Sequence, residues 1–331
     1  MRVYFDQDAD PALVLGKKIA ILGYGNQGRP QALNLRDSGA GDIRVALRVG
    51  VGAGESRQRA VADGFDVMTP SEAAAWADLL VMLMPDEAQG RVYAEQLAPF
   101  LKPNAALAFA HGLNIHFKLI VPRPDLDVFL VAPKGPGTAL RSEYQAGSGL
   151  IALFAIAQDA TGSARGLALS YAAAIGSGRV GMLETSFAEE CEADLFNEQA
   201  VLWGAIPELI HAGFDTLTEA GFSPEIAYFE CLTEVKLIAD LIYERGIAGM
   251  REAISNTAEF GALKGGDRIV TAATRTEMRR ILREVKNGSF VKDLIADAEA
   301  GYPKLRASRA GAATHPIEDV GARLRRLSER P

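Results

Sequence analysis

The feature that most constrains this fold is an apolar strand that leads straight into a glycine-rich turn. Residues 18–28 read KIAILGYGNQG, so an apolar run is followed by the spacing G-x-G-x-x-G, and residues 31–36 have helical composition. In this pattern the first glycine permits a tight turn, the second lets a pyrophosphate approach the backbone, and the third lets the helix pack closely on the strand. The turn therefore predicts a Rossmann-type dinucleotide-binding domain, with a tight turn that holds no ligand as the alternative.

Short apolar runs alternate with helical stretches over the first half of the chain. The runs are apolar throughout, which is typical of strands buried on both faces of a parallel sheet. Alternation of strands and helices predicts a doubly wound α/β domain. The predicted strands cover residues 18–22, 43–47, 79–84, 105–110, 128–132 and 150–156.

The second half of the chain has a different texture. After about residue 185 the strand-like runs disappear, and long helical windows take over at residues 188–203, 208–220, 224–243, 276–286 and 290–300. We therefore predict two domains, a nucleotide-binding domain at residues 1–186 and an all-helical domain at residues 187–331.

Composition and charge exclude several classes of protein. The 331 residues are 48% hydrophobic and 23% charged with a net charge of −7 and no Lys/Arg-rich run, so we expect a globular protein with no nucleic-acid partner. The longest apolar run, residues 150–157, is far shorter than the roughly 20 residues that span a bilayer, so we expect no membrane association. Two cysteines without CxxC spacing and an acidic N-terminus without a signal peptide indicate a reducing, cytoplasmic location.

Residues at and beyond the end of the second predicted strand indicate which dinucleotide the domain binds. NAD-binding domains usually carry an acid about 20 residues beyond the glycine turn, but Arg48 stands there, and Ser56 and Arg57 follow in the next loop. Guanidinium groups suit a 2′-phosphate, whereas Glu55 in the same loop would repel one. We therefore predict NADP(H), with NADH possible; the alternative is that these arginines are solvated loop charges.

Polar residues follow three predicted strands where each strand ends. Asp86, His111 and Lys134 each stand beside a proline or glycine just beyond an apolar run, and Gly137 closes the last of these segments. Ligands of doubly wound folds bind beyond the carboxyl ends of the strands. The three segments therefore predict an active site on one rim of the sheet.

Two pairs of carboxylates lie on helices of the second half. Asp194 and Glu198 form one pair, Glu230 and Glu234 the other, each with i, i+4 spacing that places both acids on one helix face. The apolar residues that continue each stripe predict that these faces are buried, and buried carboxylates without a cation are costly. Oxygen-only ligands predict a hard cation, Mg²⁺ or Mn²⁺, while a solvated face is the alternative.

Long strings of the sequence resemble ketol-acid reductoisomerase in its short bacterial class I form, over nearly the whole chain. The strings are GYGNQG (23–28), NLRDSG (34–39), MPDEAQ (84–89), AHGLNIHF (110–117), APKGPG (132–137), DLFNEQAVL (194–202), PEIAYFECLTEVKLIADLIY (224–243) and GIAGMREAISNTAEFG (246–261). The resemblance implies alkyl migration in 2-acetolactate or 2-aceto-2-hydroxybutyrate and NADPH reduction to a 2,3-dihydroxy-3-methyl acid, in valine and isoleucine synthesis. It also implies a knotted helical second domain.

The resemblance implies a role for each site residue. Asp194 and Glu198 would bind one Mg²⁺, Asp194 would bridge to a second, and Glu230 and Glu234 would complete that site from a neighbouring subunit of a homodimer or larger homo-oligomer. Ser255 would hold the substrate carboxylate. The catalytic candidates are His111, Lys134 and Glu234, and the cofactor-binding candidates are Gly23, Tyr24, Gly25, Asn26, Gln27, Gly28, Arg48, Ser56, Arg57, Asp86, Gln89, His111 and Gly137.

Two other functions are compatible with parts of the sequence. A simple NADP-dependent hydroxy acid dehydrogenase would explain the glycine turn and a lysine near the domain junction, but not the four acids. A non-catalytic NADP-binding regulatory protein would leave the acids structural. The sequence also departs from the family pattern at Arg29-Pro30, Thr138, Ile151 and the glycine-rich loop at residues 49–57.

Overall fold

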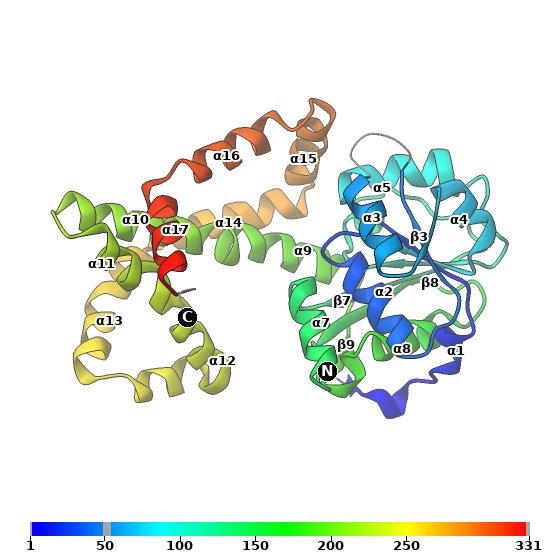
Figure 1. Ribbon diagram of the computed structural model, residues 1–331, viewed down its shortest axis with the longest axis horizontal. Helices are drawn as coiled ribbons and strands as arrows, with labels where there is room; N and C mark the ends of the chain where they lie inside the picture. The colour runs from blue at the N-terminus through cyan, green and yellow to red at the C-terminus, as the bar shows by residue number, and fades with distance from the viewer. Residues whose placement is uncertain (1, 49–53, 329–331) are drawn as a thin grey trace. The chain divides into compact units, whose positions relative to one another are not determined.

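The computed structural model describes residues 2–48 and 54–328, which form two compact units (Figure 1). The first unit comprises Met1–Cys191 and the second Glu192–Pro331. Part of the loop that the sequence singles out, residues 49–53, lies outside the described residues.

The first unit contains a mixed sheet whose strands, within the described residues, follow the order β1-β9-β8-β7-β6-β5-β2-β3-β4. The strands are β1 (Val3–Tyr4), β2 (Ile19–Leu22), β3 (Ile43–Ala46), β4 (Asp66–Met68), β5 (Leu79–Met82), β6 (Ala106–Phe109), β7 (Asp127–Pro133), β8 (Ala152–Gln158) and β9 (Met182–Glu184). The helices are α1 (Ala12–Leu15), α2 (Gly28–Asp37), α3 (Gly54–Ala62), α4 (Pro70–Trp76), α5 (Asp86–Val92), α6 (Leu113–His116), α7 (Gly137–Gln145) and α8 (Ala164–Ala174).

The predicted Rossmann-like sheet is confirmed, and every predicted strand is present, but the sheet is not wholly parallel. β8 runs antiparallel to β7, and β1 runs antiparallel to β9. The chain leaves β7 at Pro133, forms α7, and re-enters the sheet at Ala152, which pairs with Pro133. Because the chain re-enters the sheet beside the carboxyl end of β7, β8 runs antiparallel to β7.

The core of this unit lies on both faces of the sheet, as continuous apolar strands require. Successive residues of β2 alternate between the faces: Ile19 and Ile21 contribute to one buried cluster, Ala20 and Leu22 to the other. Residues of α2 and α8 cover the first face, and residues of α4 cover the second. Figure 1 shows these helices flanking the sheet.

The strand order reverses next to β2, which pairs with β3 on one side and with β5 on the other. The chain therefore builds the sheet outward in both directions from the β2–β5 boundary. In doubly wound folds the crevice at the carboxyl ends of such strands is where ligands bind. The glycine turn follows β2 directly, so the fold places it at this switch point.

The second unit is helical, as the sequence predicts. Its first helix, α9 (Phe187–Asn197), begins in the first unit and continues into the second. The further elements are η4 (Glu198–Leu202), α10 (Ala205–Glu219), α11 (Pro224–Tyr228), η5 (Phe229–Thr233), α12 (Glu234–Ala253), α13 (Asn256–Ile269), α14 (Ala272–Lys286), α15 (Ser289–Glu299), α16 (Pro303–Ala313) and α17 (Pro316–Ser328). Among the described residues, no helix combines the length and apolar character that a bilayer crossing needs.

The apolar stripes of this unit differ from the prediction. We predicted that the stripes carrying the four acids face a core, but Val201, Leu202, Leu237 and Ile238 are exposed in the single chain. α12 and α13 bury no residue at all. The prediction was wrong for the isolated chain because an apolar stripe shows that a helix needs a partner surface, without showing that the same chain supplies one.

Candidate active site

The glycine turn has the geometry that its sequence predicts. A Cβ at Gly28 would lie 2.1 Å from the carbonyl oxygen of Gly23, so only glycine lets α2 begin this close to the end of β2. A Cβ at Gly25 would meet no protein atom within 4 Å, so a side chain there would obstruct only a group approaching from outside. α2 begins at Gly28, and its N-terminus favours an anion. The turn therefore fits a dinucleotide pyrophosphate.

The turn also contacts the segment that follows β7. The Nε2 atom of Gln27 donates a hydrogen bond to the carbonyl oxygen of Gly135 at 3.1 Å. A Cβ at Gly137 would lie 1.6 Å from the carbonyl oxygen of Asn26, so the two backbones pass each other without room for a side chain. This contact brings the segment that contains Lys134 beside the predicted cofactor turn.

A buried carboxylate joins the predicted catalytic residues. Glu190, on α9, is 1% exposed and accepts a hydrogen bond from the Lys134 Nζ atom at 2.9 Å. Its other oxygen accepts from the backbone nitrogen of Gly112 at 2.9 Å and lies 3.2 Å from Nδ1 of His111. The structure thus gathers His111 from the end of β6 and Lys134 from the end of β7 around one acid.

The contacts within this cluster shift the pKa values of Glu190 and His111. Burial raises the pKa of Glu190, but the contacts with His111 and Lys134 outweigh burial and leave that pKa below its ordinary value. Burial likewise lowers the pKa of His111, but its contacts with Cys191 and Glu190 raise it well above the usual value overall. Burial raises the pKa of the Cys191 thiol, whose sulfur lies 4.0 Å from Nε2 of His111. The contacts with His111 and Lys134 therefore favour the ionised form of the Glu190 carboxyl.

The segment after β5 forms a second polar group. Gln89 is buried, and its Nε2 atom donates to the Met84 carbonyl oxygen at 2.9 Å and to Oδ1 of Asp86 at 3.0 Å. The side-chain nitrogen of Asn114 donates to the Asp86 carbonyl oxygen and to Oε1 of Gln89. These bonds hold the start of α5 against α6, which fixes the predicted cofactor residues Asp86 and Gln89 at the rim.

The residues predicted to choose between cofactors lie beyond β3. Arg48 is exposed two residues after the strand, while Ser56 and the exposed Arg57 lie in the first half of α3 together with Glu55. They are therefore on the side of the glycine turn where the adenosine ribose lies in a dinucleotide-binding fold.

The predicted metal ligands lie where two helices change their hydrogen-bonding pattern. Asp194 is on α9, one turn after Glu190, and Glu198 begins a π-helical segment. Glu230 lies in a second π-helical segment, which ends immediately before Glu234. Such π-helical turns occur frequently at functional sites. Glu198, Glu230 and Glu234 are exposed in the single chain, so they are accessible to a ligand or to a second copy of the chain.

Ser255 is the N-cap of α13. Its hydroxyl oxygen accepts a hydrogen bond from the backbone nitrogen of Ala258 at 3.2 Å. A hydroxyl that accepts in this way still has its own proton to donate. Ser255 is therefore equipped to bind a carboxylate at the positive end of a helix.

Sequence reasoning missed Glu190 and Asn114. Glu190 stands four residues before Asp194 on the same helix, so extending the i, i+4 series by one turn would have found it. Asn114 had no comparable signal, because its partners are fixed by the pairing of strands.

Comparison with known families covers both units. Residues 13–181 match the family described as acetohydroxy acid isomeroreductase, NADPH-binding domain. Residues 187–330 match the family described as ketol-acid reductoisomerase, C-terminal domain.

One solved structure gives the same result, and two others share the fold. An NADH-preferring ketol-acid reductoisomerase from an uncultured archaeon is 42% identical, with a TM-score of 0.96 and complete coverage of both chains. A semialdehyde dehydrogenase NAD-binding protein from Cupriavidus necator, solved with calcium and NAD, is 18% identical with a TM-score of 0.60 over 82% of this chain and 99% of that one. Pyrroline carboxylate reductase from Plasmodium falciparum, with NADP bound, is 14% identical with a TM-score of 0.51 over 83% and 98%. The last two share the fold alone.

Proposed function

The chain belongs to the ketol-acid reductoisomerase family, and on that premise we propose that it acts on 2-acetolactate and 2-aceto-2-hydroxybutyrate in valine and isoleucine synthesis. An alkyl group migrates within the substrate, and reduction by NADPH then gives a 2,3-dihydroxy-3-methyl acid. We assign nucleotide binding to residues 1–186 and the metal and substrate groups to residues 187–331. The family matches at residues 13–181 and 187–330 support this division.

One observation carries this proposal, the position of Glu190 on α9. Glu190 holds Lys134 and the backbone of Gly112 at the rim where the cofactor turn lies. The same helix continues into Asp194, with Glu198 next. α9 therefore carries both the acid that orders the rim and the first proposed metal ligand, and the π-helical segment that directly follows α9 begins with the second. A simple hydroxy acid dehydrogenase or an NADP-binding regulatory protein would not require this arrangement.

The donor set fits magnesium. Asp194, Glu198, Glu230 and Glu234 offer only carboxylate oxygens, and hard cations such as Mg²⁺ prefer oxygen ligands. We propose that these four residues hold two Mg²⁺ ions. When bound, the two ions supply Lewis acidity toward the substrate oxygens, and the nicotinamide supplies the hydride.

The residues of the chain prepare this chemistry. Glu190 keeps the Lys134 ammonium at the rim, and Lys134 places positive charge where negative charge develops on a substrate oxygen. His111, on the other oxygen of Glu190, adds a second polar group beside the cofactor turn. Glu234 is the proposed proton carrier, since it is a carboxylate at the start of α12. Ser255 would donate a hydrogen bond from its hydroxyl to the substrate carboxylate.

We propose NADPH as the preferred cofactor. Arg48 and Arg57 support this preference because charge-assisted hydrogen bonds to a 2′-phosphate are strong. Glu55 acts in the opposite direction, and the archaeal relative is described as NADH-preferring. Higher kcat/KM with NADH than with NADPH would overturn the assignment to Arg48 and Arg57.

We also propose that two copies share each active site. The exposed apolar residues of α12 and α13, which include Leu237, Ile247, Phe260 and Leu263, support a large self-association surface. Mixing inactive Asp194→Asn chains with inactive Glu230→Gln chains should restore partial activity through hybrid sites. Hybrids that form but stay inactive would refute the shared site.

The two free cysteines support a reducing, cytoplasmic location.

The decisive experiment follows NADPH oxidation with 2-acetolactate. We expect turnover with Mg²⁺ and none in excess chelator, because the migration requires the metal. A hydroxy acid dehydrogenase would reduce a simple 2-keto acid without Mg²⁺, and a regulatory protein would bind NADPH without turnover. Full activity with 2-acetolactate in excess chelator would refute the proposed metal site.

A further inference from the structure

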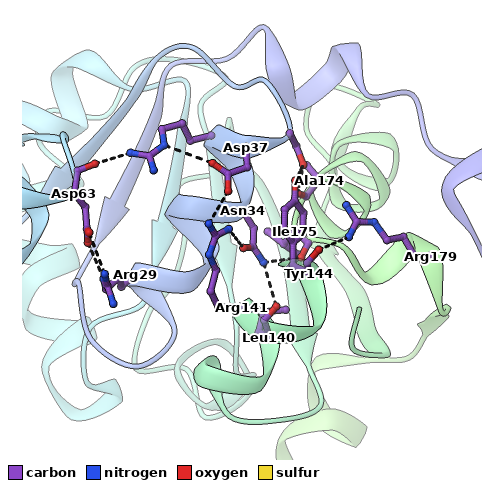
Figure 2. Close-up of polar contacts among 12 residues, drawn as sticks. Arg29, Asn34, Asp37, Asp63, Leu140, Arg141, Tyr144, Ala174, Ile175 and Arg179 are labelled. Atoms are coloured by element: carbon purple, nitrogen blue, oxygen red, sulfur yellow. Dashed lines mark hydrogen bonds and ion pairs between the residues drawn. The ribbon is translucent and has the colours of Figure 1, made fainter. Parts of the chain in front are cut away.

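A carboxylate at the end of α3 is held by the glycine turn and α2. Arg29 donates two hydrogen bonds to Asp63, from Nε at 2.6 Å and from Nη2 at 3.0 Å, and Figure 2 shows this pair. The Tyr24 hydroxyl donates to the same carboxylate at 2.8 Å, and Arg36 donates to the Asp63 carbonyl oxygen at 2.5 Å. We call these four residues the Asp63 clamp. Bidentate pairing of this kind fixes orientation as well as distance.

Helix capping does not explain Asp63. α3 ends in a Schellman motif, in which the Gly64 nitrogen donates to the Val61 carbonyl oxygen and the Phe65 nitrogen donates to the Ala60 carbonyl oxygen. Gly64 supplies the left-handed conformation, with φ of +87°. A carboxylate at a helix C-terminus is unfavourable toward the helix dipole. The two arginines offset that cost, so the acid serves the contact with α2 and not the helix itself.

α2 is a fixed support for this contact. On the side away from Asp63, the buried Asn34 donates to the carbonyl oxygens of Leu140 and Ile175. Arg141 of α7 donates to Oδ1 of Asn34 at 2.7 Å and to Asp37 at 2.6 Å. Figure 2 shows these contacts on α2 opposite the clamp. α2 is thereby attached to α7 and to the end of α8.

α3 depends on the clamp because its own packing is slight. Ala60 is the buried residue of α3 along Gly54–Ala62. A helix of this length spans about 13 Å at 1.5 Å per residue, so a small tilt at its C-terminal end displaces its N-terminal turns. Those turns carry Glu55, Ser56 and Arg57. Loss of the ion pair at Asp63 would therefore change where these side chains lie relative to the glycine turn.

We propose that Asp63 is a positioning residue for cofactor discrimination, which fixes α3 so that Ser56 and Arg57 meet the 2′ position of the adenosine ribose. This inference rests on the proposed cofactor role of Ser56 and Arg57. Glu55, which favours free ribose hydroxyls, and Arg57, which favours a 2′-phosphate, lie on the same helix. Loosening α3 therefore moves the ratio of the NADPH and NADH dissociation constants toward one, whichever cofactor the protein prefers.

The test is calorimetric titration of the full-length Asp63→Asn variant with NADPH and with NADH. We expect the ratio of dissociation constants to move toward one by about tenfold, because each charge-assisted contact is worth about that factor or more. The kcat at saturating cofactor should stay within about twofold of the unmodified protein, since the reacting atoms are untouched. An unchanged ratio in a folded Asp63→Asn protein, or a ratio of one in the unmodified protein, would overturn the proposal.

Three further variants separate the possible causes. Asp125→Asn removes another bidentate pair of the same unit, with Arg123 at 3.0 and 2.7 Å, and should leave the ratio unchanged. Arg29→Lys keeps the charge but loses the two-point contact, so it should shift the ratio in the same direction, and it carries the test alone if Asp63→Asn does not fold. Arg57→Ala tests the premise: no change in the ratio refutes the cofactor role of Arg57. A change with Arg57→Ala but not with Asp63→Asn refutes only the positioning role.

Discussion

The two units of this chain complete their cores to different extents. In the sheet unit, both faces of the central strands are buried beneath helices. In the helical unit, α10, α11 and α17 enclose a small cluster formed by Phe214, Ala227, Tyr228, Ile317 and Val320. The neighbouring α12 and α13 have 20 and 14 residues and bury none of them.

This difference follows from the architecture of each unit. A doubly wound sheet offers two broad apolar faces, and its own crossover helices cover them. Amphipathic helices gain most of their stability from packing, so α12, which is interrupted by non-helical backbone at Gly246, and α13 need a surface that the described part of this chain does not give them. Leu237 is 62% exposed and Tyr243 is 92% exposed, which supports the proposed second copy as that surface. We therefore expect the cofactor half of the proposed site to be built within one chain and the metal half to need two.

The largest expected effect separates the chemistry of the two units. Asp194→Asn should lower kcat at least about 1,000-fold by removing one of the four proposed Mg²⁺ ligands. The dissociation constant for NADPH should change less than about twofold, because all the proposed cofactor-binding residues lie in the sheet unit. Steady-state kinetics and calorimetry measure the two quantities. The control is Asp240→Asn, which removes an exposed acid paired with Lys236 on α12. A loss of NADPH binding in Asp194→Asn that is comparable to its loss of kcat would show that the units do not act separately.

The next effect concerns the acid that orders the rim. Glu190→Gln replaces one of the two acceptor oxygens with an NH₂ donor, which would face either Lys134 or the Gly112 nitrogen, so kcat should fall by about 100-fold, as for other residues that orient active groups. The exposed neighbour Glu189 provides the matched control, and Glu189→Gln should keep nearly full activity. Equal kcat values for the two variants would show that Glu190 has no role in the active site.

A third variant tests the uncovered helices. Leu237→Asp should weaken self-association at least about 30-fold, since a charge in the centre of an apolar interface costs 2 kcal/mol or more. Sedimentation velocity over a concentration series measures this constant. Val121→Asp, at a residue of the sheet unit that is 74% exposed, should change nothing. If Val121→Asp weakened self-association and Leu237→Asp did not, the sheet unit and not the helical unit would supply the association surface.

The smallest effect is the pH dependence of the Asp63 clamp. The hydrogen bonds from Arg29 hold the pKa of Asp63 below its ordinary value. Its stabilisation is therefore fully present above about pH 4 and is lost as the pH falls through the lower pKa of the folded state. Because the Arg29 side chain is 45% exposed and solvent screens the pair, Asp63→Asn should cost only about 1 kcal/mol at pH 7. Thermal unfolding of both proteins should converge below about pH 3; a difference that stays constant from pH 7 to pH 3 would contradict this assignment.

The sequence by itself determined the features that depend on local pattern. The glycine spacing at residues 23–28 and the continuous apolar runs predicted the dinucleotide turn and the strands that flank it. The spacing of Asp194 and Glu198 predicted one helix face for both acids. The predictions of the turn and of the strands succeed because each is specified by residues only a few positions apart, whereas the shared helix face stays a prediction.

Tertiary structure alone decided which distant residues meet. Glu190 bonds to Gly112 across 78 positions, and Arg29 to Asp63 across 34, so no periodicity in the sequence could reveal either contact. The short strands β1, β4 and β9 have two or three residues, too few for a recognisable pattern, and form because neighbouring strands pair with them. An apolar stripe likewise records that a helix must be covered, while the identity of the covering surface depends on how the chain and its partners pack in three dimensions.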